Sequence, residues 1–364
     1  TWLVIIFTPI VIWLGYTSMH LILPKYSIEP KINPNKIIYL KLFIYIFGSL
    51  VILRAISIWM GIYLQFGSFF AAFTNGDMIY NMSRSGQWAP GIGFFIPVDY
   101  LSIFLIGIYH KVKGKLDWLA IIITFSILSI HVGLQSRFAL LMNFAIYIGS
   151  YMGANAANIN IKFASILKFI FIGVGLVATI SLSRNLAESN SVSGEWGDYA
   201  GTFLPSIYYY LTNGIAGLNE YVKIGEDEID MLYTFNPLLY LYSFIDTSIS
   251  VSIYETKTYF TPAPTIIATW IRFLIDDFGY LGTFLQLYFY GVLLKFTEFK
   301  LKNMFSVFWI CIYVHIMAMF VLSFFSYGFF LTSFWFSLII SSLVGLIIDS
   351  SVGSILFNTY IKKK

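Results

Sequence analysis

Residues 37–64 read "IIYLKLFIYIFGSLVILRAISIWMGIYL", and this stretch decides the class of the protein. Only Lys41 and Arg54 carry a charge within it. A helix needs about 20 mainly apolar residues to cross a hydrocarbon core roughly 30 Å thick. We therefore expect this segment to cross a membrane as an α-helix.

The composition of the whole chain supports the same class. The chain is 58% hydrophobic, 20% aromatic and only 11% charged, which is less charge than a water-soluble surface requires. We expect an all-α polytopic integral membrane protein in which residues 1–364 form a single transmembrane domain. The single cysteine, Cys311, rules out an intrachain disulfide and argues against a cysteine-based metal site.

Nine apolar segments predict membrane crossings, and the lysines between them predict their orientation. Lysines next to a crossing mark its cytoplasmic end. They gather in the first, third, fifth and seventh connections and at the end of the chain, so we expect Thr1 outside and the last residues inside. The predicted crossings are 2–22, 37–64, 92–110, 117–135, 137–154, 162–182, 279–297, 304–325 and 327–349.

The arginines follow the opposite distribution. All five fall on the outer side of this topology or in the outer half of a crossing, where orientation does not require them. The planar guanidinium holds phosphate or carboxylate through two hydrogen bonds, so several arginines around one outer cavity would suit a pyrophosphate. Pairing with local acids or with lipid headgroups is the simpler alternative. The five are Arg54, Arg84, Arg137, Arg184 and Arg272.

Residues 183–262 form the only long connection, which we expect to be an extracytoplasmic loop. It holds ten acidic and three basic residues, a charge of about −7. Two apolar, aromatic stretches within it, 202–222 and 231–245, predict helices that lie in the membrane interface. Their tyrosines could stack on sugars or form an ordinary interfacial belt.

The stretch "IRFLIDDFGYLG" (271–282) places unusual charge beside the seventh crossing. Residues 265–275 are too short to cross, so we expect 263–278 to be a re-entrant or interfacial segment that breaks at 276–279. Asp276 lies four residues after Arg272, which predicts an ion pair within one helix. Asp277 is then left to cap the next helix or to serve a substrate.

Other ionisable residues lie near the predicted outer surface. Asp77 falls in the connection 73–91, His131 near the turn between the fourth and fifth crossings, and Asp99 near the outer end of the third. His315 lies in the middle of the eighth crossing, where we expect a neutral histidine that is hydrogen-bonded by a neighbouring helix.

Three motifs resemble the Wzy-type family, the polymerases of O-antigen and capsular oligosaccharide repeat units. The tyrosine-rich segment "YYYLTNGIAGLNEY" (208–221) is similar to one in the family's large outer loop, and "GLQSRFALL" (133–141) is similar to a short element that lacks the inserted Gln-Ser. The family pattern Asn, Thr, Arg, then "DFG..G" is matched except that Ile266 replaces the asparagine. The matching residues are Thr269, Arg272, Asp277, Phe278, Gly279 and Gly282.

The resemblance implies a fold, a reaction and a location. The expected fold is a GT-C-like bundle of about 9–11 transmembrane helices in the bacterial cytoplasmic membrane, with its active site on the periplasmic or outer side. The implied enzyme transfers a growing glycan from undecaprenyl diphosphate to the non-reducing end of an incoming lipid-linked repeat unit. It implies no cofactor, metal or nucleic acid. The expected partners are the lipid-linked donor and acceptor, the bilayer and a chain-length regulator protein.

The same resemblance and the outer placement of the residues together give a set of candidate site residues. Fixed cations would stabilise the diphosphate leaving group, and a base would accept the proton of the acceptor hydroxyl. The catalytic candidates are Arg272, Asp277, His131 and Asp77; those for the diphosphate are Arg84, Arg137, Arg184 and Arg272; those for the glycan are Tyr210, Asn213 and Tyr221.

Two other functions fit a helical bundle with an acidic outer loop. An O-antigen ligase would transfer the finished polymer to a lipid A core, but its usual histidine-containing loop pattern is not found. A flippase or secondary transporter of lipid-linked oligosaccharides would place polar residues along a path through both leaflets and would show internal repeats. The ionisable residues crowd the outer half instead, and we find no repeat.

Overall fold

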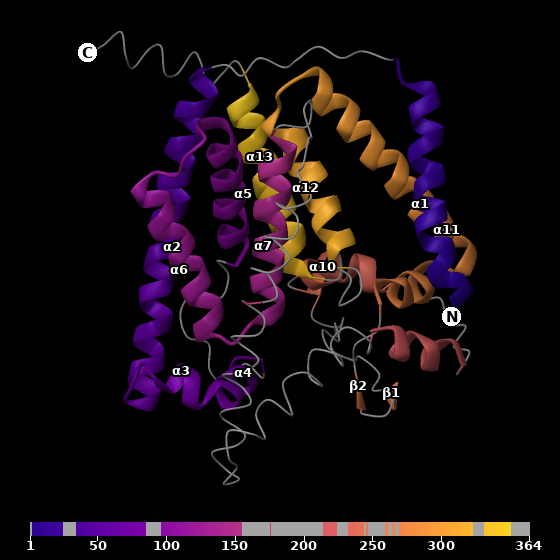
Figure 1. Ribbon diagram of the computed structural model, residues 1–364. Coiled ribbons are helices and arrows are strands. Elements are labelled where there is room, and N and C mark those ends of the chain that lie inside the picture. Colours follow the sequence, from indigo (N-terminus) through magenta and orange to yellow (C-terminus); the bar gives the residue numbers. More distant parts are fainter. Residues whose placement is uncertain are drawn as a thin grey trace.

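The computed structural model describes residues 2–24, 34–84, 96–154, 175, 214–223, 232–243, 245–246, 259–260, 264–265, 269–322 and 331–350. These residues form helices and one pair of two-residue antiparallel strands (Figure 1). A further helix spans residues 214–223. The labelled elements are α1 (Trp2–Ile22), α2 (Pro34–Phe66), α3 (Ala71–Thr74), α4 (Gly76–Arg84), α5 (Ile96–Lys113), α6 (Trp118–Gly133), α7 (Arg137–Gly153), α10 (Leu232–Ser243), β1 (Tyr259–Phe260), β2 (Pro264–Thr265), α11 (Trp270–Asn303), α12 (Val307–Val321) and α13 (Thr332–Asp349).

The helices agree with the apolar pattern of the sequence. Each predicted crossing overlaps a labelled helix except 162–182, of which the structure describes residue 175 alone. Among the described residues, three helices are long and apolar enough to cross a membrane: Leu3–Ile22, Lys36–Phe66 and Thr332–Asp349. Three shorter helices are also apolar: Trp118–Gly133, Phe138–Gly153 and Val307–Val321. The fold is therefore compatible with a helical membrane protein.

Helix α2 shows why burial alone does not account for its apolar character. One face packs into the bundle, while the other exposes large apolar side chains at a helical spacing of three to four residues over much of its length. A water-soluble surface rarely carries so long an apolar stripe, whereas a lipid-facing surface requires one. The exposed residues include Ile38, Leu42, Ile46, Leu53, Ile56, Met60 and Leu64.

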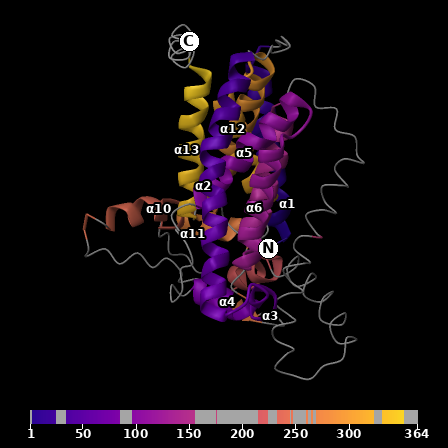
Figure 2. The same ribbon diagram turned by 90° about the vertical axis from the view of Figure 1, so that its left-hand side faces the viewer.

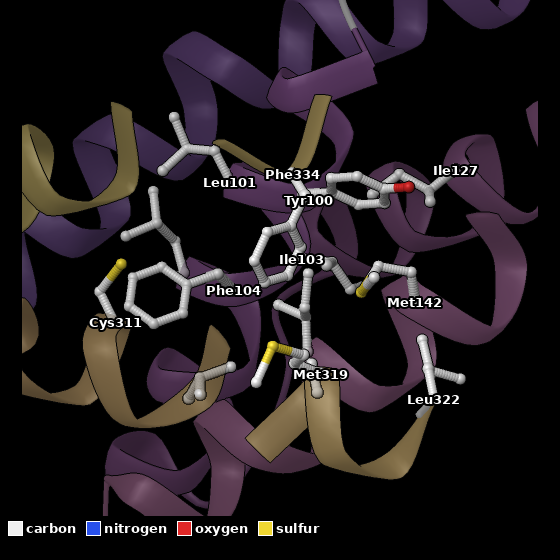
Figure 3. Packing of buried hydrophobic residues seen from close by; sticks show 14 of the residues in the cluster. Tyr100, Leu101, Ile103, Phe104, Ile127, Met142, Cys311, Met319, Leu322 and Phe334 are labelled. Carbon is white, nitrogen blue, oxygen red and sulfur yellow. The ribbon is translucent and has the colours of Figure 1, made fainter. Parts of the chain in front are cut away.

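Helix α5 lies at the centre of the bundle and packs against α2, α7 and α13. Every residue from Pro97 to Tyr109 is buried. Figure 3 shows rings of α5, including that of Phe104, packed among Met142 of α7, Met319 of α12 and Phe334 of α13. Gly107 allows α7 to approach α5 closely, because a Cβ there would lie 1.9 Å from the Ser150 Oγ.

One end of the bundle, which we call the lysine end, is fastened by ion pairs. Lys36 at the start of α2 lies 2.7 Å from the Asp349 carboxylate at the end of α13, and its Nζ also donates to the Phe305 carbonyl. Asp349 accepts hydrogen bonds from the Ser306 hydroxyl and from the backbone N–H of Phe308, and so caps α12. Helices α3 and α4 lie at the opposite end (Figures 1 and 2), and so do the two strands (Figure 1).

Helix α1 packs along α11 at the right of Figure 1. The two backbones touch at two glycines: a Cβ on Gly15 would lie 2.1 Å from the Tyr288 carbonyl oxygen, and one on Gly291 would lie 2.0 Å from the Ile12 carbonyl oxygen. Close approach through small residues is a common way for helices to associate in lipid. Near the lysine end, Tyr16 donates a hydrogen bond to Glu298 on α11.

The expected break at 276–279 is confirmed, and it falls at Gly279. Helix α11 (Trp270–Asn303) consists of two helical parts that meet at a kink, where Gly279 has non-helical angles of φ 64° and ψ 178°. Glycine adopts positive φ without steric cost, so one residue absorbs the whole bend. The helix expected over 265–275 also begins later, because 264–265 form strand β2 and Thr269 is still extended.

Candidate functional site

Arg272 is buried at the start of α11, with 1% of its surface exposed. Its guanidinium carbon lies 5.7 Å from the ring centre of Tyr221 and 5.6 Å from that of Phe273. Its Nε lies 3.4 Å from the Asp276 carboxylate, which confirms the ion pair expected from their spacing. The two aromatic faces and the Asp276 carboxylate therefore stabilise the charge of this buried guanidinium.

Tyr221 connects this arginine to the large loop. It lies on the helix over 214–223, and its hydroxyl donates a 2.6 Å hydrogen bond to the second oxygen of Asp276. Burial and this bond to the carboxylate raise the pKa of the Tyr221 hydroxyl above its usual value, so the hydroxyl remains a donor. Tyr221, Asp276 and Arg272 thus form one contiguous unit, which we call the Arg272 unit.

Asp277 performs a different task from its neighbour. Its carboxylate accepts hydrogen bonds from the backbone N–H groups of Tyr233 at 2.9 Å and Thr234 at 2.6 Å, and from the Thr234 hydroxyl. Tyr233 and Thr234 are in the first turn of α10, whose N–H groups have no partner within the helix. Asp277 therefore caps a helix, as expected, but the helix is α10 and not the one that follows. Burial raises the pKa of Asp277, and the donated hydrogen bonds offset part of that rise.

The motif glycines have structural roles in the same bend. Gly279 supplies the positive φ, and its carbonyl accepts a 2.7 Å hydrogen bond from the Thr283 hydroxyl. A Cβ on Gly282 would lie 2.6 Å from the Cβ of Phe278. The "DFG..G" pattern thus shapes a bend directly after the two carboxylates. Before the bend, Asp276 pairs with Arg272 within one helix, whereas Asp277 bonds to α10.

A second group of ionisable side chains lies within the helices. Arg54 of α2 forms an ion pair with Asp99 of α5, and the His131 Nε2 of α6 lies 3.8 Å from the same carboxylate oxygen. Asn143 of α7 approaches His131 through its side-chain amide at 2.7 Å. None of the four is more than 5% exposed. We call Arg54, Asp99, His131 and Asn143 the buried polar cluster.

The hydrogen bonds of Asn143 determine which nitrogen of His131 carries the proton. The Asn143 Nδ2 also donates to the Ala139 carbonyl at 2.9 Å, which fixes the orientation of the amide. The same nitrogen therefore donates to the His131 Nε2, so a neutral ring carries its proton on Nδ1. In this arrangement His131 offers a hydrogen-bond donor and not the free lone pair of a base.

Gln135 explains part of the insertion in the segment 133–141. Its φ of 54° lies in the left-handed region, and its buried side chain donates to the carbonyls of Ala72 and Val132 at 2.8 Å each. These bonds join the turn between α6 and α7 to α3 at the end opposite the lysines. The residue has a structural role that the motif comparison did not predict.

Several predicted site residues lie beyond what the structure describes. Arg184, Tyr210 and Asn213 lie outside the described residues, and so do the side chains of Asp77 and Arg84 on α4 and Arg137 on α7. The convergence of arginines on one cavity therefore stays a prediction. Of the five arginines, the structure describes the side chains of Arg54 and Arg272, which lie in the two separate groups above.

His315 agrees with its expected structural role. Its Nε2 lies 3.0 Å from the Ser337 hydroxyl on α13, and its Nδ1 lies 2.9 Å from the Cys311 carbonyl of its own helix.

The sequence analysis placed Arg54 and Asp99 in separate crossings but did not predict that they form an ion pair. The available signal was the opposite charge of two residues in the outer halves of their apolar runs.

In the part of the chain that the structure describes, no three His, Cys, Asp or Glu side chains gather as they would around a metal ion. Comparison of the chain with protein-family models, with curated proteins and with solved structures found no match.

Proposed function

We propose that this chain is a polytopic membrane glycosyltransferase with a GT-C-like bundle that polymerises undecaprenyl-diphosphate-linked oligosaccharide repeat units. The Arg272 unit is the observation that carries the proposal. It joins a buried guanidinium at the start of α11 to a helix of the large loop, at the site where the motif resemblance expects a cation. We assign the end of the bundle that carries the Arg272 unit to the outer face of the bacterial cytoplasmic membrane.

Arg272 would act on the lipid diphosphate that leaves the growing glycan. Transfer of the glycan breaks the bond between its terminal sugar and the diphosphate, so negative charge develops on the leaving oxygen. A buried guanidinium that is already oriented stabilises such charge without reorganisation. Asp276 and Tyr221 hold Arg272 in place. A guanidinium is the planar group that can bind phosphate through two parallel N–H donors.

Asp277 has a positioning role in this proposal and is not the base that accepts the proton of the acceptor hydroxyl. Its carboxylate already accepts three hydrogen bonds from α10, so most of the lone pairs that a base would use are engaged. It therefore fixes the large loop against α11, and the glycan would lie along the loop helices that carry Tyr221. His131, as a neutral donor, is likewise not in the form of a base.

A glycan-length ladder from cells that lack this protein tests the proposal. Complementation with the wild type should restore long polymer, whereas Arg272→Ala and Arg272→Lys should leave chiefly single repeats that are still exported. Lysine should not rescue, because it lacks the planar fork. Lys223→Ala is the matched control, since Lys223 is exposed on the Tyr221 helix and, among the described residues, pairs with Glu220 at the surface.

Each other outcome identifies a different function. Long polymer from Arg272→Ala at normal protein level contradicts the role of Arg272. Loss of all export in cells lacking the protein would indicate a flippase. Polymer that accumulates on the carrier lipid without reaching its final acceptor would indicate a ligase.

A further inference from the structure

Three aromatic side chains join the two parts of α11 to each other and to α12. Trp270 begins the first part, residues 270–278, and Tyr290 lies in the second part, residues 280–303. Their rings stack with centroids 6.0 Å apart. Phe320 of α12 packs edge-on against both rings, at 5.5 Å from that of Trp270 and 6.2 Å from that of Tyr290. We call these three residues the aromatic clasp.

The clasp shows how strongly α11 bends at Gly279. Residues 270 and 290 of a straight helix would lie about 30 Å apart, at a rise of about 1.5 Å per residue. Stacked rings at these two positions therefore require the first part to fold back toward the second. Glycine permits this bend, but it permits many other backbone directions as well. Contacts between the two parts must select one direction, and the clasp supplies such a contact.

The first part of α11 carries Arg272 two residues after Trp270. Trp270 and Tyr290 are each 3% exposed, so the stacked rings are fixed in a packed interior. A tilt of this short helical part would displace the Arg272 guanidinium with it. The rings of Phe273 and Tyr233, 5.0 Å apart, connect the same part to α10 in the large loop. The clasp instead connects it to the helices of the bundle.

We propose that the aromatic clasp positions Arg272 against the lipid diphosphate, which makes Trp270, Tyr290 and Phe320 positioning residues for the transfer. This inference rests on the proposed function. Misplacement of a catalytic group by about 1 Å can lower a rate on the order of 100-fold. Loss of the clasp should lower kcat and leave KM for the lipid-linked repeat unit nearly unchanged, because the charge on the leaving oxygen develops in the transition state.

The variants Tyr290→Leu and Phe320→Leu test the position of Arg272 without a measurement of activity. Phenylglyoxal reacts with accessible arginines, and mass spectrometry of the peptides gives a labelling rate for each one. Arg272 is 1% exposed, so it should react slowly in the wild type and several-fold faster in both variants. Arg54, buried among the other helices, is the internal reference and should keep its rate.

Tyr290→Phe and Tyr288→Leu are the matched controls for this labelling. Tyr290→Phe keeps the ring and loses only the hydroxyl, which accepts a hydrogen bond from Gln286, so Arg272 should label as in the wild type. Tyr288→Leu removes a tyrosine from the same part of α11 on the side that faces α1, where its hydroxyl contacts Ser18. It should also leave the labelling of Arg272 unchanged.

Kinetics with the purified lipid-linked repeat unit test the consequence for the reaction. Tyr290→Leu should lower kcat about 10- to 100-fold, whereas Tyr290→Phe should stay near the wild type. In an Arg272→Ala background Tyr290→Leu should cause no further loss, since the clasp acts through Arg272. Phe104→Leu makes the same change as Phe320→Leu in the centre of the bundle, and it should lower the melting temperature without lowering kcat.

The outcomes separate this inference from the proposed function. A wild-type protein without polymerase activity contradicts the proposed function, and the labelling rates then decide whether the clasp holds Arg272. Unchanged labelling of Arg272 in both Tyr290→Leu and Phe320→Leu overturns the clasp, and so does a rise that Arg54 shares. A loss of kcat that Phe104→Leu matches, or that Tyr290→Leu adds to Arg272→Ala, overturns its role in positioning Arg272.

Discussion

Gly15 of α1 and Gly291 of α11 lie at a crossing where each helix touches the backbone of the other. The contact leaves no room for a methyl group on either side, since the nearest atoms are carbonyl oxygens and not flexible side chains. Much of the remaining surface of α1 is exposed and apolar, including Leu3, Phe7 and Trp13. The position of α1 therefore depends chiefly on its seam with α11.

Gly291→Ala should separate α1 from α11. Overpacking against rigid backbone typically costs about 1–3 kcal/mol, and we expect a loss of this size in the free energy of unfolding. Disulfide formation between cysteines placed along the two helices would report the separation directly. Gly149→Ala is the control, because its nearest neighbour is a methyl group of Val314 at 3.2 Å, which can move. Equal losses in the free energy of unfolding for the two variants would contradict a close backbone contact at Gly291.

The Arg54–Asp99 pair should behave as a buried ion pair in a double-mutant cycle. Arg54→Leu or Asp99→Leu alone leaves an uncompensated charge, so each should cost about 3–5 kcal/mol of unfolding free energy. The double variant should recover most of that loss, because both charges are gone. Unfolding in mixed detergent micelles measures the four proteins, and additive losses would show that the residues do not depend on each other.

Asp277→Asn should loosen α10 from α11. An asparagine keeps one acceptor but turns an NH2 group toward the backbone donors of Tyr233 and Thr234, with an expected cost of about 1–3 kcal/mol. Chymotrypsin should then cleave at the tyrosines of α10 more rapidly. Thr234→Val removes one of the three bonds and should have an intermediate effect, whereas Thr17→Val removes only bonds within its own helix.

The raised pKa of Asp277 predicts the sign of a pH effect. The folded protein holds this proton more tightly than the unfolded chain, whose aspartates titrate near 3.8. The contribution of Asp277 to the free energy of unfolding is therefore fully present below pH 3.8. It is lost as the pH rises through the raised pKa of the folded state. The difference in unfolding free energy between the wild type and Asp277→Asn should shrink as the pH rises over this range. A difference that grows with pH would contradict the direction of the shift.

The sequence predicted what depends on local composition. Long apolar runs located α1, α2 and α13, and the four-residue spacing predicted the Arg272–Asp276 pair. Aromatic apolar stretches also located α10 and the helix over 214–223 within the large loop.

Contacts between distant residues could not be predicted from composition. Asp277 caps α10, which begins 45 residues earlier, because α10 packs against α11 in the folded protein. Spacing alone favoured the helix that follows. The Arg54–Asp99 pair likewise depends on how α2 packs against α5, and nothing in either apolar run shows which faces meet. The helices α3 and α4 are too short for an apolar periodicity to reveal them.

Asp349 has a consequence for the order in which the protein assembles. It is the last residue of α13, the final described helix to leave the ribosome, yet it caps α12 and neutralises Lys36 at the start of α2. Until it arrives, the first turn of α12 and that ammonium group lack their carboxylate. Synthesis of α13 therefore completes a junction begun more than 300 residues earlier (Lys36 to Asp349), and a chain truncated before it would expose a recognisable defect to cellular quality control.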